Sequence, residues 1–239
     1  MKIGFIQTGA IGDIVIALPA AKWYVDRGCQ IFWPIDSRFF DFFKKAAPYV
    51  DFLPVPTEIP SIDWHLGTPI KLLNEVGIKD YFILYSYIGS AGKRLQLGHP
   101  EILYQSLKFD EYKYAVCQVP FSEKWNLHIE RDMDAEARVL EMISADKPYS
   151  IIHKAPAGIR EDIEGFMLHK KASRIVKVSN LTDSPFDWIS AFQSAEILAM
   201  EDSLHANLVE QLNIPVDKYL FLRSGCRQTP VFKNGWVFK

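Results

Sequence analysis

The stretch KIGFIQTGAIGDIVIALPA, residues 2–20, decides the fold of this chain. It begins with a short apolar run, continues through a glycine-containing turn, and ends with apolar residues at helical spacing. This order predicts a strand, a tight loop and a helix, which Pro19 should kink because its ring nitrogen cannot donate a hydrogen bond. In an open parallel sheet, ligands bind at such a loop, where a strand ends and a helix begins.

The same alternation continues outward from this stretch. We expect strands at 29–34, 50–55 and 81–85, and helices at 37–47, capped by Ser37, and at 67–76. Strands that alternate with helices indicate a parallel sheet, because parallel neighbours need a long connection between them. The pattern then loosens, and we expect one more strand, at 112–119, before residue 130.

A second alternating unit follows residue 130. Its expected helices are 135–144, 161–169, 185–193 and 203–212, and its expected strands are 149–153, 173–178, 196–200 and 218–222. We therefore predict an α/β chain of two Rossmann-like parallel-sheet domains, residues 1–130 and residues 131–239.

Composition excludes several classes of protein. The chain has 239 residues, of which 49% are hydrophobic, so it can bury a sizeable core. Its net charge of -2 and the lack of a basic run give no signature for binding duplex nucleic acid. Three widely spaced cysteines suit neither a disulfide framework nor a zinc site, which favours a cytoplasmic location. With no apolar stretch of about 20 residues, we expect no transmembrane segment, and peripheral membrane contact stays open.

The segment Gly9-Ala10-Ile11-Gly12-Asp13, followed by a helix that carries a proline, resembles the opening of the heptosyltransferases of glycosyltransferase family 9. The resemblance implies a GT-B fold, in which an N-terminal acceptor-side domain and a C-terminal nucleotide-binding domain face each other across a cleft. It also implies that Asp13 is the base that deprotonates the acceptor hydroxyl, with Gly12 near the donor. The residues alone leave another role open, because a carboxylate here also caps or complements the helix N-terminus.

The segment AEILAMEDSLHANL, residues 195–208, is similar to the donor-site segment of the same family. The resemblance implies that Asp202, Ser203 and His205 bind the donor, where free N–H groups of a first helical turn can meet a diphosphate. The family usually places a glycine-containing insertion before the histidine, and this chain lacks it. Read without the family, Asp202 and Ser203 form an N-cap and His205 is a surface histidine.

The segment YSIIHKAPAGIR, residues 149–160, looks like the strand and loop that open the family's second domain. The resemblance implies that Lys154, as a catalytic residue, and Arg160, as a donor-binding residue, neutralise the leaving diphosphate, the role a metal plays in other transferases. The alternative is a loop with two solvated charges.

Metal and cofactor signals are weak throughout. Asp132-Met133-Asp134 has the D-x-D form that binds a metal nucleotide in a different transferase fold, but its position directly before a helix favours capping. The loop around Gly9 and Gly12 does not follow the G-x-G-x-x-G pattern of dinucleotide-binding proteins. We therefore expect no metal site and no cofactor.

Together these features predict a glycosyltransferase. Its expected reaction moves a sugar from a nucleotide-diphosphate donor to a hydroxyl of a glycan or other acceptor, with inversion and without a metal. Two alternatives stay open: a nucleotide-sugar epimerase or NAD-type oxidoreductase, and a non-catalytic nucleotide- or glycan-binding module.

Overall fold

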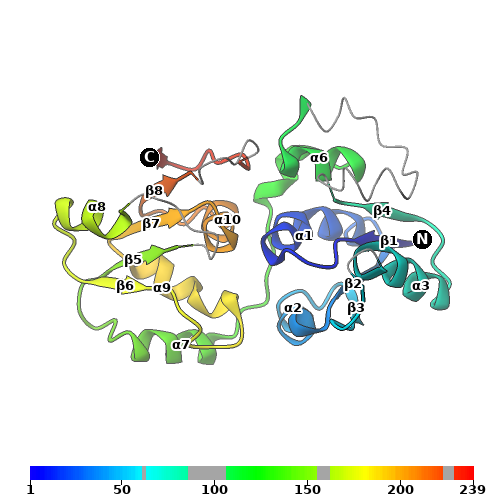
Figure 1. The fold of residues 1–239 in the computed structure, drawn as a ribbon, viewed down its shortest axis with the longest axis horizontal. Coiled ribbons are helices and arrows are strands. Elements are labelled where there is room, and N and C mark those ends of the chain that lie inside the picture. Colours follow the sequence, from blue (N-terminus) through cyan, green and yellow to red (C-terminus); the bar gives the residue numbers. More distant parts are fainter. Residues whose placement is uncertain (61–62, 86–105, 155–161, 223–228) are drawn as a thin grey trace. The chain divides into compact units, whose positions relative to one another are not determined.

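The computed structural model describes residues 1–60, 63–85, 106–154, 162–222 and 229–239. The chain divides into two compact units, Met1–Glu130 and Arg131–Lys239. Each unit is built around its own parallel sheet (Figure 1).

The sheet of the first unit has four parallel strands in the order β3-β2-β1-β4. The strands are β1 (Lys2–Ile6), β2 (Gln30–Asp36), β3 (Asp51–Val55) and β4 (Tyr81–Ile83). The helical segments are α1 (Ile11–Val25), η1 (Ser37–Phe39), α2 (Phe40–Ala46), η2 (Asp63–Gly67), α3 (Thr68–Glu75), α6 (Phe109–Val116) and η3 (Phe121–Trp125). Nearly all of β1 and β2 is buried, as expected for central strands of a parallel sheet.

Helix α1 is the central helix of the first unit. Every residue from Ile14 to Ala21 is buried, so the helix is covered on all sides. Pro19 lies inside this run, and α1 continues beyond it to Val25. Helices α6 and η3 contact α1.

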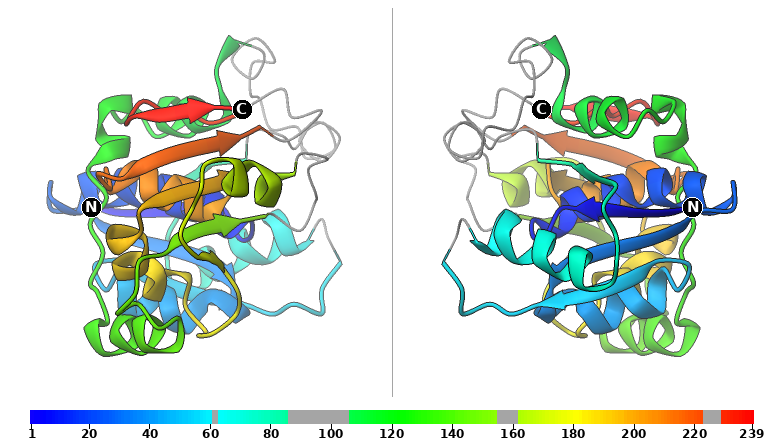
Figure 2. Two further views of the ribbon diagram at one scale, coloured as in Figure 1. Left: turned by 90° about the vertical axis from the view of Figure 1, so that its left-hand side faces the viewer. Right: turned by 90° about the vertical axis from the view of Figure 1, so that its right-hand side faces the viewer.

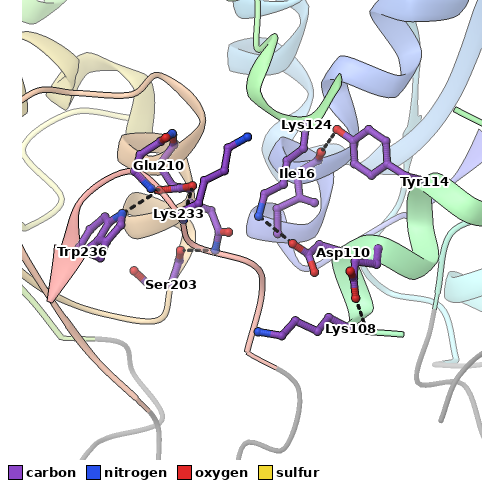
Figure 3. Close-up of polar contacts among 12 residues, drawn as sticks. Ile16, Lys108, Asp110, Tyr114, Lys124, Ser203, Glu210, Lys233 and Trp236 are labelled. Carbon is purple, nitrogen blue, oxygen red and sulfur yellow. Dashed lines mark hydrogen bonds and ion pairs between the residues drawn. The ribbon is translucent and has the colours of Figure 1, made fainter. Parts of the chain in front are cut away.

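The strand predicted at 112–119 is wrong, because most of this segment belongs to helix α6. Alternating apolar residues suggested a strand, but Tyr112, Lys113 and Tyr114 are all buried, which a strand with one covered face does not allow. The side chain of Glu111 accepts a hydrogen bond from the backbone N–H of Lys108 at 2.9 Å and stabilises the helix start. The Tyr114 hydroxyl then donates to the carbonyl of Ile16 in α1 at 2.8 Å (Figure 3).

The cap predicted at Ser37 is also wrong by one residue. The carboxylate of Asp36, at the end of β2, accepts from the backbone N–H of Arg38 at 2.9 Å, and Ser37 begins the helical turn η1. Asp36 is fully buried and also binds the Arg38 guanidinium, so the cap and the ion pair share one carboxylate.

The sheet of the second unit has five parallel strands in the order β6-β5-β7-β8-β9, and all point the same way (Figure 2). The strands are β5 (Ser150–His153), β6 (Ile175–Lys177), β7 (Ile197–Glu201), β8 (Asp217–Phe221) and β9 (Trp236–Phe238). The helical segments are α7 (Met133–Met142), α8 (Ile163–His169), η4 (Pro185–Trp188), α9 (Ile189–Ser194) and α10 (Leu204–Gln211).

Strand β9 was not expected from the sequence, because it is only three residues long. A buried carboxylate in α10 holds the segment before it: Glu210 accepts hydrogen bonds from the backbone N–H of Lys233 at 2.9 Å and from the Trp236 indole at 2.9 Å (Figure 3). The short strand therefore depends on contacts with a distant helix.

Candidate active site

The first βα connection turns sharply over the end of β1. Ala10 precedes α1 with a φ of 57°, in the left-handed region, and supplies no side-chain cap. Gly9 lies directly against an aromatic ring, because a Cβ atom there would be 2.1 Å from Cη2 of Trp64. Only glycine fits at this position. Trp64 and His65 thus meet the loop, although no sequence motif assigned them a role.

The backbone amides of this loop already have a partner. The Tyr85 hydroxyl oxygen accepts from the N–H of Thr8 at 2.7 Å and from the N–H of Gly9 at 3.4 Å. Burial raises the pKa of Tyr85 to about 12, so the phenol stays neutral. Because these two N–H groups are used, the loop differs from a glycine loop that cradles phosphate. Gly12, expected near the donor, lies half-buried in the first turn of α1.

Asp13 occupies the first turn of α1, and its side chain is 12% exposed. The residue at the N-cap is Ala10, so Asp13 is not the N-cap residue; its charge complements the positive end of the helix. Its Oδ1 atom lies 3.8 Å from Nζ of Lys113. A partly accessible carboxylate in this turn, after the end of β1, can accept a proton from a ligand bound there.

Lys113 was missed by the sequence analysis. It comes from α6 and is fully buried. Its ammonium donates to Oε1 of Gln7 at 2.8 Å and to the carbonyl of Leu84 at 2.9 Å. Burial lowers the pKa of Lys113, and the Asp13 carboxylate opposes this effect. No spacing rule joins Asp13 to a lysine on a helix that was predicted to be a strand.

A second buried ion pair joins α6 to η3. Nζ of Lys124 contacts Oδ2 of Asp110 at 2.7 Å, and both side chains are fully buried (Figure 3). Asp110 is three positions before Lys113, so the two ion pairs lie along one side of α6. The first unit thus buries two lysines, each close to a carboxylate.

In the second unit, the ends of β5 and β7 bring a serine and two histidines together. These strands are neighbours in the sheet, with His153 paired to Met200. Ser203 caps α10 by accepting from the N–H of Ala206 at 3.4 Å, and its Oγ is 3.0 Å from Nδ1 of His153. The rings of His153 and His205 are 4.4 Å apart. Ser203 and His205 were predicted to act together; His153 lies in the segment 149–160 but was not chosen.

Both histidines are neutral at neutral pH. Burial lowers the pKa of His153 to about 4, and burial together with His153 lowers the pKa of His205 to about 3. His205 is half-buried, and so it is not the exposed surface histidine of the alternative interpretation. It lies against the ring of Phe192, and within the described chain its Nδ1 atom is buried without a hydrogen-bond partner.

Asp202 and Ser203 do not share the role of N-cap. Asp202 is 2% exposed, and its backbone N–H donates to the carbonyl of Phe221 at 3.2 Å. Ser203, rather than Asp202, provides the N-cap of α10.

The predicted leaving-group cations are only partly described. Lys154 follows β5, and its half-exposed ammonium lies 3.7 Å from Oε1 of Glu164, which Lys177 also contacts at 2.8 Å. Exposed pairs of this kind contribute little to stability, so Lys154 can exchange its partner. Arg160 lies outside the described residues.

The predicted capping role of the D-x-D segment is confirmed. The Asp132 carboxylate accepts from the N–H of Ala135 at 2.9 Å at the start of α7. Across the described ranges there is no group of three or more His, Cys, Asp or Glu side chains that could hold a metal ion. Within those ranges no helix is long and apolar enough to cross a membrane.

Comparison with known proteins identifies solved structures that have the same fold. No protein-family model and no curated protein matches the sequence. Solved structures do match over the whole chain. A family 9 glycosyl transferase from Veillonella parvula is 13% identical, with a TM-score of 0.63 and 86% of its length covered. The E. coli ADP-heptose LPS heptosyltransferase II is 13% identical, with a TM-score of 0.62 and 90% of its length covered.

A third match is the iron-containing dodecameric glycosyltransferase TibC of E. coli, 13% identical, with a TM-score of 0.60 and 62% of its length covered. At these identities the likeness establishes the fold. The chain has the α/β fold with two parallel sheets that these glycosyltransferases share, as the sequence predicted.

Proposed function

We propose that this chain is a glycosyltransferase that moves a sugar from a nucleotide-diphosphate donor to the hydroxyl of a glycan or another acceptor. The observation that carries the proposal is the likeness to the heptosyltransferase fold, which extends over the whole chain. The position of Asp13 supports it, because ligands of open parallel sheets bind where the strands end. The proposal includes residues 1–130 as the acceptor-side domain and residues 131–239 as the donor domain, with the cleft that transfer between them requires.

The proposed chemistry is a single displacement. Asp13 takes the proton of the acceptor hydroxyl while the acceptor oxygen bonds to the anomeric carbon of the sugar. The bond from that carbon to the diphosphate breaks, and its electron pair leaves with the phosphate oxygen. One displacement inverts the anomeric centre. The positive end of helix α1 favours the ionised form of Asp13, so Asp13 accepts the proton late, when the hydroxyl has become acidic.

The donor diphosphate is proposed to bind at the start of α10. The Ser203 hydroxyl, the first-turn N–H groups and neutral His205 offer hydrogen bonds there, and the helix adds a partial positive charge. Because the two histidines are neutral, the charge of the leaving diphosphate must be met elsewhere. We assign that role to Lys154, released from Glu164, and to Arg160, without a metal.

The test is turnover of ADP-, UDP- and GDP-sugars with a panel of glycan acceptors, with chelator and with added metal. Wild type should transfer the sugar in the presence of chelator, and Asp13→Asn should abolish transfer while nucleotide binding stays. Asp26→Asn is the matched control, because Asp26 ends the same helix in an exposed ion pair with Lys22. Transfer at close to the wild-type rate in Asp13→Asn removes Asp13 from the mechanism. Transfer that requires iron or another metal refutes the metal-free part.

The same panel separates the alternatives. A nucleotide-sugar epimerase converts the donor when no acceptor is added, and an oxidoreductase depends on NAD. A binding module raises its melting temperature with a nucleotide-sugar but shows neither hydrolysis nor transfer under any condition.

A further inference from the structure

Lys113 is a buried charge directly beside the proposed base. Its ammonium has three N–H donors, and neutral acceptors take two of them: the amide oxygen of Gln7 at 2.8 Å and the carbonyl of Leu84 at 2.9 Å. Asp13 Oδ1 lies 3.8 Å away, which is too long for a strong hydrogen bond but close enough for a charge interaction. The ammonium is thus fixed by two strand ends and faces one carboxylate.

Burying an ammonium is unfavourable unless an opposite charge compensates it. Gln7 and Leu84 supply dipoles without net charge. Asp110, also on α6, is bound to Lys124 at 2.7 Å, so it forms a separate neutral pair. Asp13 therefore supplies the larger compensating charge for Lys113, and Asp110 adds a smaller one.

Among the other titratable groups near this pair, Asp110 also favours the charged form of Lys113, whereas Tyr85 and Cys117 are neutral. Burial raises the pKa of Tyr85 to about 12 and raises the pKa of Cys117 well above its usual range. Near neutral pH, the phenol and the thiol are both protonated. Lys113 and the N-terminus of α1 thus both favour the charged form of Asp13.

We propose that Lys113 is a positioning residue that acts through Asp13: it keeps the carboxylate charged and fixed at the end of β1. This inference rests on the proposed function for its catalytic meaning, but the charge coupling exists whether or not transfer occurs. Without the lysine, a proton should bind Asp13 more tightly. The base would then be lost at a higher pH, and its position would be less fixed.

The main experiment is a ¹³C NMR titration of the Asp13 carboxyl carbon, identified by its absence in Asp13→Asn. In Lys113→Met the titration midpoint should rise by about one pH unit, because the neighbouring cation is gone. Lys124→Met is the matched control: it removes an equally buried lysine with a different partner, and it should leave the Asp13 midpoint unchanged. An unchanged midpoint in Lys113→Met overturns the inference.

A reciprocal measurement covers the case in which Lys113→Met does not fold. Asp13→Asn alters a partly exposed side chain, and by linkage it should lower the pH at which Lys113 deprotonates. The ¹³Cε shift of Lys113 reports this, and an unshifted lysine titration overturns the inference.

Kinetics then connect the coupling to function. In Lys113→Met the acid limb of kcat/KM should move to higher pH in parallel with the NMR midpoint, and kcat should fall while donor binding is unchanged. An acid limb that does not move while the NMR midpoint does refutes the catalytic role of Lys113. If wild type transfers no sugar, the proposed function fails, and the NMR titrations still decide whether the pair is coupled.

Discussion

Both candidate loops lie where strands of a parallel sheet end, but they differ in the charge of the groups that they bring together. In the first unit, the end of β1 carries a charged pair, Asp13 with buried Lys113. In the second, the ends of β5 and β7 carry neutral groups, Ser203 with His153 and His205. Proton transfer needs a group that can change its charge, whereas holding an anion needs only oriented N–H and O–H groups. The difference is consistent with the roles proposed above, proton transfer at the first loop and donor binding at the second.

The largest expected effect is at Asp13. Asp13→Asn keeps the shape but removes the base, so kcat should fall roughly 10³-fold, the usual contribution of a general base. The dissociation constant for nucleotide should stay within about twofold, because the neutral loop is intact. Kinetics and calorimetry of the same preparation check both values. If Asp13→Asn mainly weakened nucleotide affinity and left kcat unchanged, Asp13 would belong to the donor site and would not be the base.

The next effect tests how much a buried ion pair of the first unit contributes to its stability. Asp110→Asn leaves the Lys124 ammonium buried without its ion-pair carboxylate, so the free energy of unfolding should fall by about 3 kcal/mol. Glu75→Gln, in the exposed pair with Lys71, should cost under about 0.5 kcal/mol. Urea unfolding of the full chain measures both variants, and equal losses would show that burial of the pair is unimportant.

The two neutral histidines of the second unit should make its stability depend on pH. His153 and His205 have folded-state pKa values of about 4 and about 3, below the value of 6.5 for an unperturbed histidine. Since the unfolded chain binds these protons first, stability should fall as the pH drops from about 6.5 towards 4. Between pH 7 and 5.5 the loss should be about 1 kcal/mol for each histidine.

His205→Phe removes one of these titrations and keeps a ring beside Phe192. Urea unfolding at the two pH values should show a smaller acid loss in this variant than in wild type. An identical loss would mean that His205 does not carry the pH dependence.

The smallest effect concerns the cap of α10. Ser203→Ala loses the bond to the Ala206 N–H and the contact with His153, so stability should fall by about 1 kcal/mol. Nucleotide affinity should fall several-fold while kcat changes little, which is the reverse of Asp13→Asn. Ser184→Ala, at the cap of η4, is the control and should affect stability alone.

Part of this site was readable from sequence because its contacts are local. The Ser203 cap reaches three residues ahead, and the Asp132 cap does the same, so short patterns predicted both. The cap at Ser37 failed by one residue because Asp36, at the end of the preceding strand, competes for the same N–H group. Local rules identify the kind of contact better than the residue that makes it.

The groups that were missed all reach across the fold. Lys113 meets Gln7 over 106 residues, and His153 meets Ser203 over 50. The helix that carries Lys113 was predicted to be a strand, because the apolar alternation there gave no sign that a lysine is buried between two tyrosines. Charged residues are normally expected on the surface, so a buried lysine is not predicted from the sequence pattern. Positions that break the pattern in this way are often functional.

By itself the sequence determined the α/β class and the turn that presents Asp13, because both follow from the periodicity of apolar residues and from glycines next to each other in the chain. Tertiary structure decided which side chains meet there. The order of strands in a sheet places β4 beside β1 and β5 beside β7, and this order depends on packing of the whole unit rather than on any short segment. The pairing of Asp13 with Lys113 at one loop, and of Ser203 with two neutral histidines at the other, is a consequence of that packing.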